Sequence, residues 1–376
     1  MGLALGGCTG VGLSTDSLSG PQPSGPPQQA AAIGTGHVKV GLILPLSASG
    51  NAGLAAQSMK NAAEMAIAEF NNPDVQLLVK DDAGSAQGAQ QAAQQALDEG
   101  AEVILGPLFA HTVGAAGQAA RTRGVPVIAF STDSNVAARG VYLLSFLPES
   151  DVDRIVSYAV AQGKRSFVAL LPDSAYGTVV EAAFKQAVAR KGGRIVALER
   201  YEASKLQDPV RAVAQAAGRA DALFVPDSAD GVTAVVQALA ANGVNLKRLQ
   251  PLGTGLWDDP RIFSDAALQG GWFAAPDPVG YQAFAGRYRS RYGQEPVRTA
   301  TLAYDAVALV AALVKTQGGQ RFSDEVLTNP SGFAGIDGVF RFRRDGTNER
   351  GLAVMEVGSG GSRVLAPAPK TFGSGT

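Results

Sequence analysis

The sequence predicts an α/β protein with two doubly wound, Rossmann-like lobes. From residue 38 onward, short apolar runs of strand length alternate with Ala-rich segments of helical length. This pattern is typical of parallel sheets with crossover helices on both faces. The alternation runs twice, over 38–145 and 150–275, and 376 residues exceed the length of one ordinary domain. Ligands of such sheets bind beyond the carboxyl ends of the strands, so a cleft between the lobes is the expected site.

The first lobe begins at the run HVKVGLILPL, which predicts a buried strand that ends before Pro45. In the following predicted helix, 54–70, apolar residues recur at three- and four-residue steps and form one stripe. Three further apolar runs between turn residues predict strands, at 75–80, 102–106 and 125–130.

The second lobe repeats this pattern, with predicted strands at 166–171, 194–200, 221–226 and 271–275 and a predicted helix at 179–191. The last quarter of the chain differs. Residues 283–293 and 299–315 have helical patterns, whereas 335–357 alternates like a β-hairpin that turns at Asp345-Gly346. A long helical return before a hairpin indicates that the chain crosses between the lobes more than once.

The charge balance and the single cysteine exclude several classes of protein. Lys and Arg total 32 against 33 Asp and Glu, a formal net charge of −1, which argues against nucleic acid as a partner. The sequence contains no run of about 18 apolar residues, which is the length needed to span a bilayer. One cysteine, Cys8, makes neither an internal disulfide nor a thiolate metal site, and it fits both a reducing compartment and the periplasm.

Signatures of enzymes are missing from the sequence. The two histidines, His37 and His111, do not form a His-rich metal site. Neither a G-x-S-x-G elbow nor a G-x-x-x-x-G-K-[ST] phosphate loop is present, and GTGHVKVG precedes its strand instead of following it. We therefore expect a non-enzymatic protein without cofactor or metal.

Five motifs, in sequence order, resemble those of a known family. They are LILPLSASGNAG, VILGPLFAHTVGAAGQAARTRGVPVIAFSTDSN, DSAYGTVVEAAFKQAVARKGGRIV, FAGRYRSRYGQEPVRTATLAYDAVALV and GIDGVFRFRRDG. Over about 38–357 the chain resembles the type 1 periplasmic binding proteins, specifically the leucine/isoleucine/valine (branched-chain amino acid) binding family. It is similar, nearly as closely, to the binding-protein-like domain of lipoproteins that activate penicillin-binding proteins in peptidoglycan synthesis.

The first resemblance implies an envelope protein that captures an amino acid or related polar solute and delivers it to an ABC permease. Its lobes would close by a hinge motion at crossings expected near 146–149, 275–278 and 331–336. The implied N-terminal lobe is 37–147 plus 278–331, and the implied C-terminal lobe is 148–277 plus 332–368. The second resemblance implies a protein-interaction scaffold that docks on a penicillin-binding protein.

The resemblance places the α-carboxylate of a ligand at the loop that follows the strand VPVIAF. The hydroxyl groups of Ser131 and Thr132 suit an anion there. Asp133 adds a negative charge, and an N-cap or Asx turn is the structural alternative for this cluster. The family tyrosine that reaches into the cleft corresponds to Tyr176, for which packing at a helix start is the alternative.

The carboxylate that holds the ligand ammonium in the family falls, in register, on Gly255. We expect Asp258 to substitute for it and Trp257 to form a wall of the pocket, although a buried core position is the commoner fate of a tryptophan.

Five more candidate ligand contacts lie in loops that follow predicted strands. Ser47 follows the opening strand, and His111 and Thr112 follow the Gly106-Pro107 turn. For Thr112 a helix cap, and for His111 a structural role, are the alternatives. Asp227 and Ser228 follow the strand DALFVP and are secondary candidates.

The segment LGGC, residues 5–8, resembles a lipobox, in which the cysteine is diacylated and becomes the mature N-terminus. Only seven residues precede Cys8, so 1–8 is expected to be a truncated signal, and an unmodified Cys8 is the alternative. Residues 9–36 are rich in Gly, Ser, Pro and Gln and predict a disordered tether. The expected location is the periplasmic face of the cell envelope, lipid-anchored.

Overall fold

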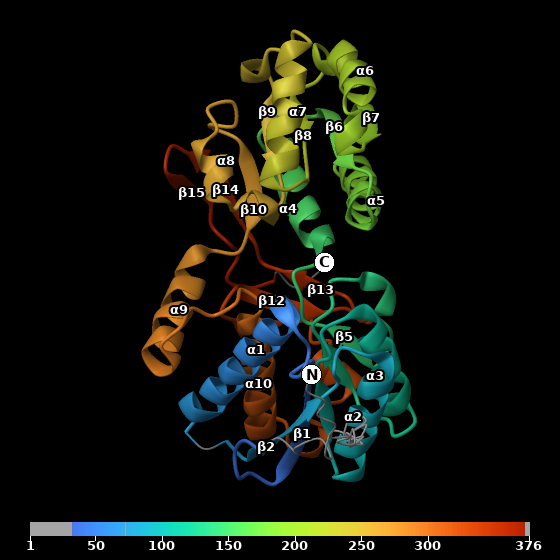
Figure 1. Ribbon diagram of the computed structural model, residues 1–376, viewed down its shortest axis with the longest axis vertical. Coiled ribbons are helices and arrows are strands. Elements are labelled where there is room, and N and C mark those ends of the chain that lie inside the picture. Colours follow the sequence, from blue (N-terminus) through green and yellow to red (C-terminus); the bar gives the residue numbers. More distant parts are fainter. Residues whose placement is uncertain (1–31, 72, 373–376) are drawn as a thin grey trace, which may run out of the picture.

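The computed structural model describes residues 32–71 and 73–372. It has two lobes stacked along its longest axis (Figure 1), each built on its own mostly parallel sheet, so the predicted fold class is confirmed. The lipobox and residues 9–31 of the expected tether lie outside the described residues. The tether is shorter than expected at its far end, because the backbone of Ile33 exchanges hydrogen bonds of 3.0 and 2.8 Å with Leu77.

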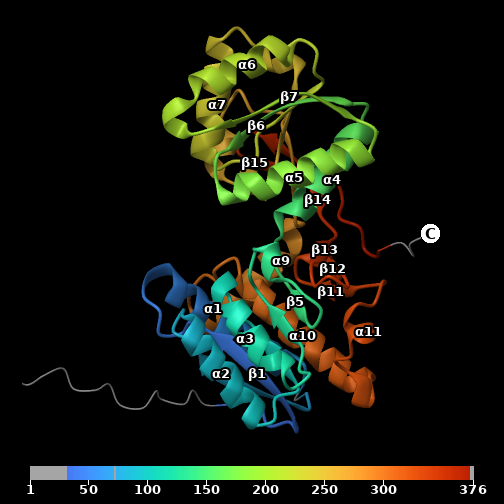
Figure 2. The same cartoon turned by 90° about the vertical axis from the view of Figure 1, so that its right-hand side faces the viewer.

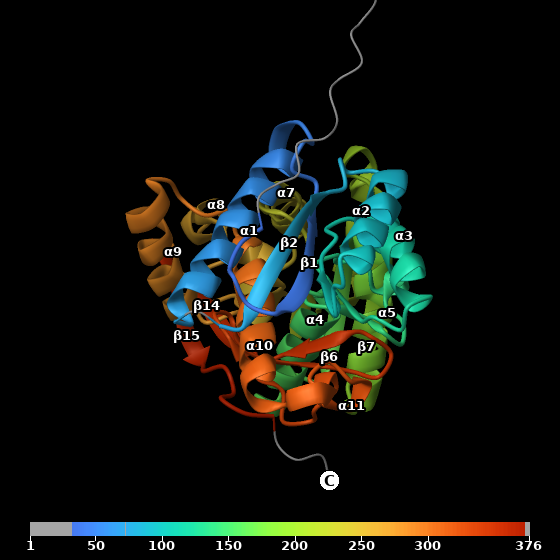
Figure 3. The ribbon, with the colours of Figure 1, turned by 90° about the horizontal axis from the view of Figure 1, so that it is seen from below.

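The first lobe contains a five-stranded parallel sheet in the order β2-β1-β3-β4-β5. Its strands are β1 (Val38–Leu44), β2 (Val75–Asp81), β3 (Val103–Leu105), β4 (Val127–Ala129) and β5 (Val141–Leu143). One face is covered by α1 (Gly50–Glu69) and α10 (Ala300–Thr316), the other by α2 (Ala86–Asp98) and α3 (Ala110–Arg121) (Figure 3). A further helix, α9 (Pro278–Tyr292), packs beside α1.

The second lobe contains a seven-stranded sheet in the order β15-β14-β10-β9-β8-β6-β7. Five strands are parallel: β6 (Ser166–Pro172), β7 (Arg194–Tyr201), β8 (Ala222–Phe224), β9 (Gln250–Gly253) and β10 (Trp272–Ala275). Two antiparallel strands extend the edge, β14 (Ala353–Gly358) and β15 (Gly361–Ala366). The helices α4 (Pro148–Ala161) and α5 (Ala175–Arg190) cover one face, and α6 (Gln207–Ala217) and α7 (Ala229–Ala241) cover the other (Figure 2). The short helix α8 (Pro260–Ser264) packs on the same face as α6 and α7.

A small antiparallel sheet, β11 (Phe333–Gly335), β12 (Gly338–Phe342) and β13 (Asn348–Arg350), follows the short helix α11 (Asp324–Leu327). Pairing of β12 with β13 confirms the hairpin at Asp345-Gly346. Its side chains Phe340 and Phe342 are buried in the core of the first lobe. We therefore place 332–350 with the first lobe, where the sequence had suggested the second.

Three segments connect the two sheets, at residues 144–147, 276–277 and 351–352. The first two lie where the sequence predicted crossings, but the third comes after β13 and not near 331–336, because β11 and β12 pack on the first lobe. The carbonyl oxygen of Ser145 accepts hydrogen bonds from Asn348 Nδ2 at 2.8 Å and from Arg350 Nε at 2.9 Å. The first crossing is thereby bonded to β13, the strand that leads into the third crossing.

Every strand predicted from an apolar run is present within two residues of its expected bounds. The Ala-rich helices pack closely on the sheets because alanine adds little bulk, and Ala56, Ala63 and Ala66 of α1 are fully buried. Within the described residues, no helix has both the length and the apolar character needed to cross a membrane.

Candidate functional site

A cavity of about 930 Å³ lies where the two lobes face each other. The first lobe contributes Thr132 and Asp133 to its lining, the second lobe contributes Tyr176 and Asp258, and the first crossing contributes Phe146. These residues follow the carboxyl ends of β4, β5, β6 and β9, which is where sheets of this type bind ligands. We take this interlobe cavity as the candidate site.

The first-lobe wall is the loop after β4, and its polar groups are largely engaged with one another. Ser131 is buried, and its Oγ accepts the backbone N–H of Asp133 at 3.1 Å. Asp133 Oδ1 in turn accepts the backbone N–H of Asn135 at 3.0 Å and its Nδ2 at 2.8 Å. This is the Asx-turn arrangement named above as the alternative. Of the two predicted contacts, Thr132 lines the cavity and Ser131 does not; Asp133 and Asn135 also line it.

Tyr176 lines the second-lobe wall at the start of α5, as predicted. Ser174 caps this helix, its Oγ accepting the backbone N–H of Gly177 at 3.1 Å. A Cβ on Gly177 would lie 1.9 Å from the Pro172 carbonyl oxygen, so glycine lets the helix begin close against β6. The phenol oxygen lies 2.9 Å from Thr254 Oγ1, and burial raises the pKa of Tyr176. Tyr176 therefore supplies an uncharged wall.

Trp257 is a core residue and is not part of the cavity lining. Its Nε1–H donates to the Val225 carbonyl oxygen at 2.9 Å, and its side chain is fully buried. A Cβ on Gly253 would lie 2.1 Å from the indole ring, so β9 must carry glycine there to admit it. Of the two interpretations offered for Trp257, the structure has the buried one.

A carboxyl group does lie beside Gly255, but another helix supplies it. Asp151, in the first turn of α4, lines the cavity and accepts the Gly255 backbone N–H on Oδ2 at 2.9 Å. A Cβ on Gly255 would lie 3.2 Å from the same oxygen. Burial raises the pKa of Asp151 to about 7, against the opposing effects of the Gly255 N–H and of Arg350. Asp151 thus stands in space where the sequence register predicted an acid.

Asp258 lines the cavity as predicted, and burial raises its pKa while the Arg298 guanidinium acts in the opposite direction. Arg298 also lines the cavity, but it is already paired. Its Nη1 and Nη2 donate to the two oxygens of buried Asp337 at 3.0 and 2.6 Å. Its Cζ lies 4.6 Å from the ring centroid of Tyr281 and 4.7 Å from that of Phe146, distances suited to cation–π contacts. Arg298 therefore joins α9, the turn between β11 and β12, and the first crossing at one edge of the site.

With this geometry in hand, comparison with known proteins identifies the family. Residues 37–362, most of the chain, match the family described as periplasmic binding protein. The chain belongs to the periplasmic binding protein family. A search of curated protein sequences finds no match.

Solved structures of other binding proteins share the fold at low sequence identity. A branched-chain amino acid ABC transporter protein from Rhodospirillum rubrum has a TM-score of 0.77 at 20% identity, covering 87% of this chain and 99% of that one. An ABC transporter substrate-binding protein from Desulfitobacterium hafniense in complex with Leu has a TM-score of 0.64 at 20% identity, with coverage of 87% and 99%. A solute binding protein from R. palustris in complex with benzoate has a TM-score of 0.58 at 20% identity, with coverage of 89% and 98%.

Three further predicted residues of this periplasmic binding protein are not part of the cavity lining. Ser47 is exposed. His111 is also exposed, and its Nε2 lies 2.9 Å from the Gly84 carbonyl oxygen while its ring stacks on Phe109. Thr112 is buried and caps α3, its Oγ1 accepting the Phe109 N–H at 3.2 Å and donating to the Phe109 carbonyl at 2.9 Å. The structural alternatives given for His111 and Thr112 match these contacts.

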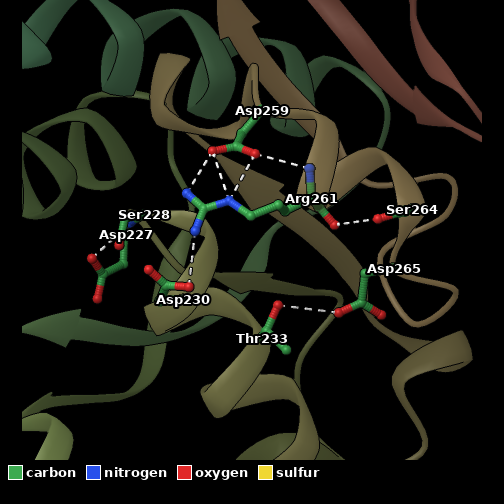
Figure 4. A network of polar contacts seen from close by, with 8 residues as sticks. All are labelled: Asp227, Ser228, Asp230, Thr233, Asp259, Arg261, Ser264 and Asp265. Carbon is green, nitrogen blue, oxygen red and sulfur yellow. Dashed lines mark hydrogen bonds and ion pairs between the residues drawn. The ribbon is translucent and has the colours of Figure 1, made fainter.

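Asp227 and Ser228 line a separate hollow of about 450 Å³ on the second lobe. Asp227 Oδ1 accepts the backbone N–H of Ser228 at 2.7 Å. Figure 4 shows the neighbouring polar network, in which Arg261 Nη1 donates to Asp230 at 2.9 Å. These side chains belong to the α7 and α8 side of the second sheet, apart from the lining of the interlobe cavity.

Sequence reasoning therefore brought Thr132, Tyr176 and Asp258 to one cavity but missed Asp151 and Arg298. Arg298 lies within a motif that carried the family resemblance, so its position was available as a signal. The sequence contains no such signal for Asp151, because Asp151 and Gly255 are 104 residues apart in the chain. They meet only because the first crossing directs the start of α4 toward Gly255.

Proposed function

We propose that this chain is a solute-binding protein of the cell envelope that captures a small polar ligand, an amino acid or similar compound, for an ABC importer. The observation that carries the proposal is the cavity of about 930 Å³ lined from both lobes and bordered by two crossings. A ligand that contacts both walls binds the closed arrangement more tightly than the open one, so binding favours closure. This role requires no catalytic group.

The family relationship supports the binding role without specifying the ligand. One structural relative is in complex with Leu and another with benzoate, and these compounds differ in size, charge and hydrogen-bonding groups. A panel of small solutes is therefore the appropriate first experiment.

A thermal-shift panel of amino acids, organic acids, amines and small anions tests the proposal. A ligand at about 100 times its Kd stabilises by about 2.7 kcal/mol, which raises Tm by a few degrees. Small-angle scattering should show a smaller radius of gyration with the same compound. Tyr176→Ala, which removes part of the wall, should reduce the ligand-induced shift, whereas Ser47→Ala, outside the lining, should leave it unchanged.

No shift with any compound, together with capture of a penicillin-binding protein by the folded lobes, would overturn the proposal in favour of the scaffold role. Membrane attachment through a lipid on Cys8 is a separate part of the proposal. It predicts palmitate labelling of the chain when expressed with an intact export signal, and loss of that label in Cys8→Ser.

A further inference from the structure

The lining of the interlobe cavity carries an excess of acidic groups. Asp133, Asp151 and Asp258 all line it, and none of them forms an ion pair among the described residues. The single lining cation, Arg298, has both terminal nitrogens bonded to the Asp337 carboxylate. A second cation nearby, Arg350, is buried outside the lining. Its Nε donates to the Ser145 carbonyl oxygen, its Nη1 and Nη2 have no hydrogen-bond partner among the described residues, and its charge partly offsets the effect of burial on Asp151. Among the described residues, the cavity thus has acidic groups to offer a ligand and no unpaired cation in its lining.

A ligand carboxylate finds few donors in this cavity. In the loop after β4, the Asp133 N–H is bonded to Ser131 Oγ, and the Asn135 N–H and Nδ2 are bonded to the Asp133 side chain. The Asp133 carboxylate also adds like charge next to Thr132. Desolvating a second carboxylate there without partners would be unfavourable.

The carboxyl group of Asp151 is well placed to accept a ligand cation. It accepts one hydrogen bond among the described residues, from the Gly255 N–H to Oδ2. Burial disfavours its charged form, which is why its pKa rises to about 7. An ammonium group beside this carboxylate would favour its charged form and so offset the effect of burial.

Apart from Arg298 and the polar side chains of Thr132, Asn135 and Thr178, the remaining lining is largely apolar and partly aromatic. Phe146 and Tyr281 stand at the first-lobe edge, and Tyr176, Val179 and Leu256 stand on the second lobe. Leu256 is 45% exposed, so a ligand with an apolar body would cover it. The aromatic faces also suit a cation adjacent to such a body.

We propose that the natural ligand is a basic amine with an apolar body, whose ammonium group is held by Asp151 and whose binding requires no carboxylate. The proposal rests on the solute-binding function proposed above and names its substrate class. It differs from amino-acid recognition because the acid comes from α4 instead of from position 255, and because the loop after β4 carries an acid of its own.

Calorimetric titration of the full chain in phosphate buffer near pH 8 tests this with two matched sets of probes. The first set is 3-methylbutylamine, leucine and 4-methylpentanoate, which share one branched body and differ only in the ammonium and carboxylate groups. The second set is phenethylamine, phenylalanine and 3-phenylpropionate. We expect the amine of at least one set to bind at least tenfold more tightly than the matching acid, and no more weakly than the matching amino acid.

Asp151→Asn should weaken binding of that amine at least tenfold, which corresponds to about 1.4 kcal/mol. Asparagine keeps an oxygen that accepts the Gly255 N–H, so the loop is retained while the charge is lost. Asp227→Asn, outside the cavity lining, is the matched control and should bind the amine as the unchanged protein does.

Tighter binding of an amino acid or an acid than of its amine would overturn the amine proposal and leave the solute-binding function standing. An unchanged affinity in Asp151→Asn would do the same. If none of the six probes binds, the amine proposal is overturned, and if the wider thermal-shift panel also gives no shift, the solute-binding function falls with it.

Discussion

Replacing Asp305 with asparagine should stabilise the protein, and the gain should increase with pH. Asp305 lies in α10 and is 2% exposed. Its Oδ1 accepts the Ile336 N–H at 2.8 Å, and its Oδ2 is buried without a hydrogen-bond partner among the described residues. Burial raises the pKa of Asp305 from 3.8 to about 7, so the folded state disfavours the ionised carboxylate.

The size and sign of the effect follow from this pKa. At about 1.36 kcal/mol per pKa unit, the rise from 3.8 to about 7 corresponds to about 4 kcal/mol of lost stability once the group is ionised in both states. Between those two pH values the unfolded chain loses its proton while folded Asp305 keeps it, so stability falls as pH rises. Asparagine has no proton to lose. The advantage of Asp305→Asn should therefore be larger near pH 8 than near pH 5 by roughly 2.7 kcal/mol.

Urea denaturation of both proteins at the two pH values measures this difference. Asp208→Asn, at a carboxyl group that is 91% exposed, controls for the substitution itself. If the difference in unfolding free energy between Asp305→Asn and the unchanged protein is equal at pH 5 and pH 8, the buried carboxyl does not titrate as argued and the reasoning is wrong.

Three further predictions concern single residues of the strands and helices. Gly253→Ala should destabilise by about 1–3 kcal/mol because its Cβ would lie 2.1 Å from the Trp257 ring, whereas Gly286→Ala, with open space around its Cβ, should stabilise by about 0.5–1 kcal/mol. Equal thermal midpoints would contradict this. Tyr176→Phe should lower the free energy of unfolding by about 1 kcal/mol because it loses the hydrogen bond to buried Thr254. Ligand affinity should remain nearly unchanged. A large loss of affinity would instead show that the phenol contacts the ligand directly. Affinity for the amine probe should rise about tenfold from pH 6 to pH 8 as Asp151, with its pKa of about 7, ionises, and a flat titration profile would exclude it as the acceptor.

The strands and most helices were predictable because each depends on local pattern. A run such as 166–171 is buried on both faces of a sheet, and that burial is visible in the sequence as an uninterrupted apolar segment. The hairpin at Asp345-Gly346 was likewise local. Its packing was not, because burial of Phe340 and Phe342 in the first lobe depends on the path of the chain through space.

The residues of the site likewise include some that the sequence could predict and some that it could not. Thr132, Tyr176 and Asp258 follow strands closely, and the family resemblance singled them out among the residues at the carboxyl ends of the parallel strands. Loops after strands also carry capping residues, and Thr112 shows that this location alone cannot separate a cap from a ligand contact. Asp151 lay beyond reach because its relation to Gly255 depends on how a crossing directs α4 toward β9.

The bonds to the Ser145 carbonyl have a mechanical consequence. With Asn348 and Arg350 of β13 both bonded to that oxygen, the first connection between the lobes is held against the strand from which the third connection begins. The first and third connections thus lie together, whereas the segment 276–277 is a separate connection. The lobes can bend about the line through these two places. Twisting across that line would break the bonds to Ser145. These bonds therefore favour bending of the lobes about this line over twisting across it.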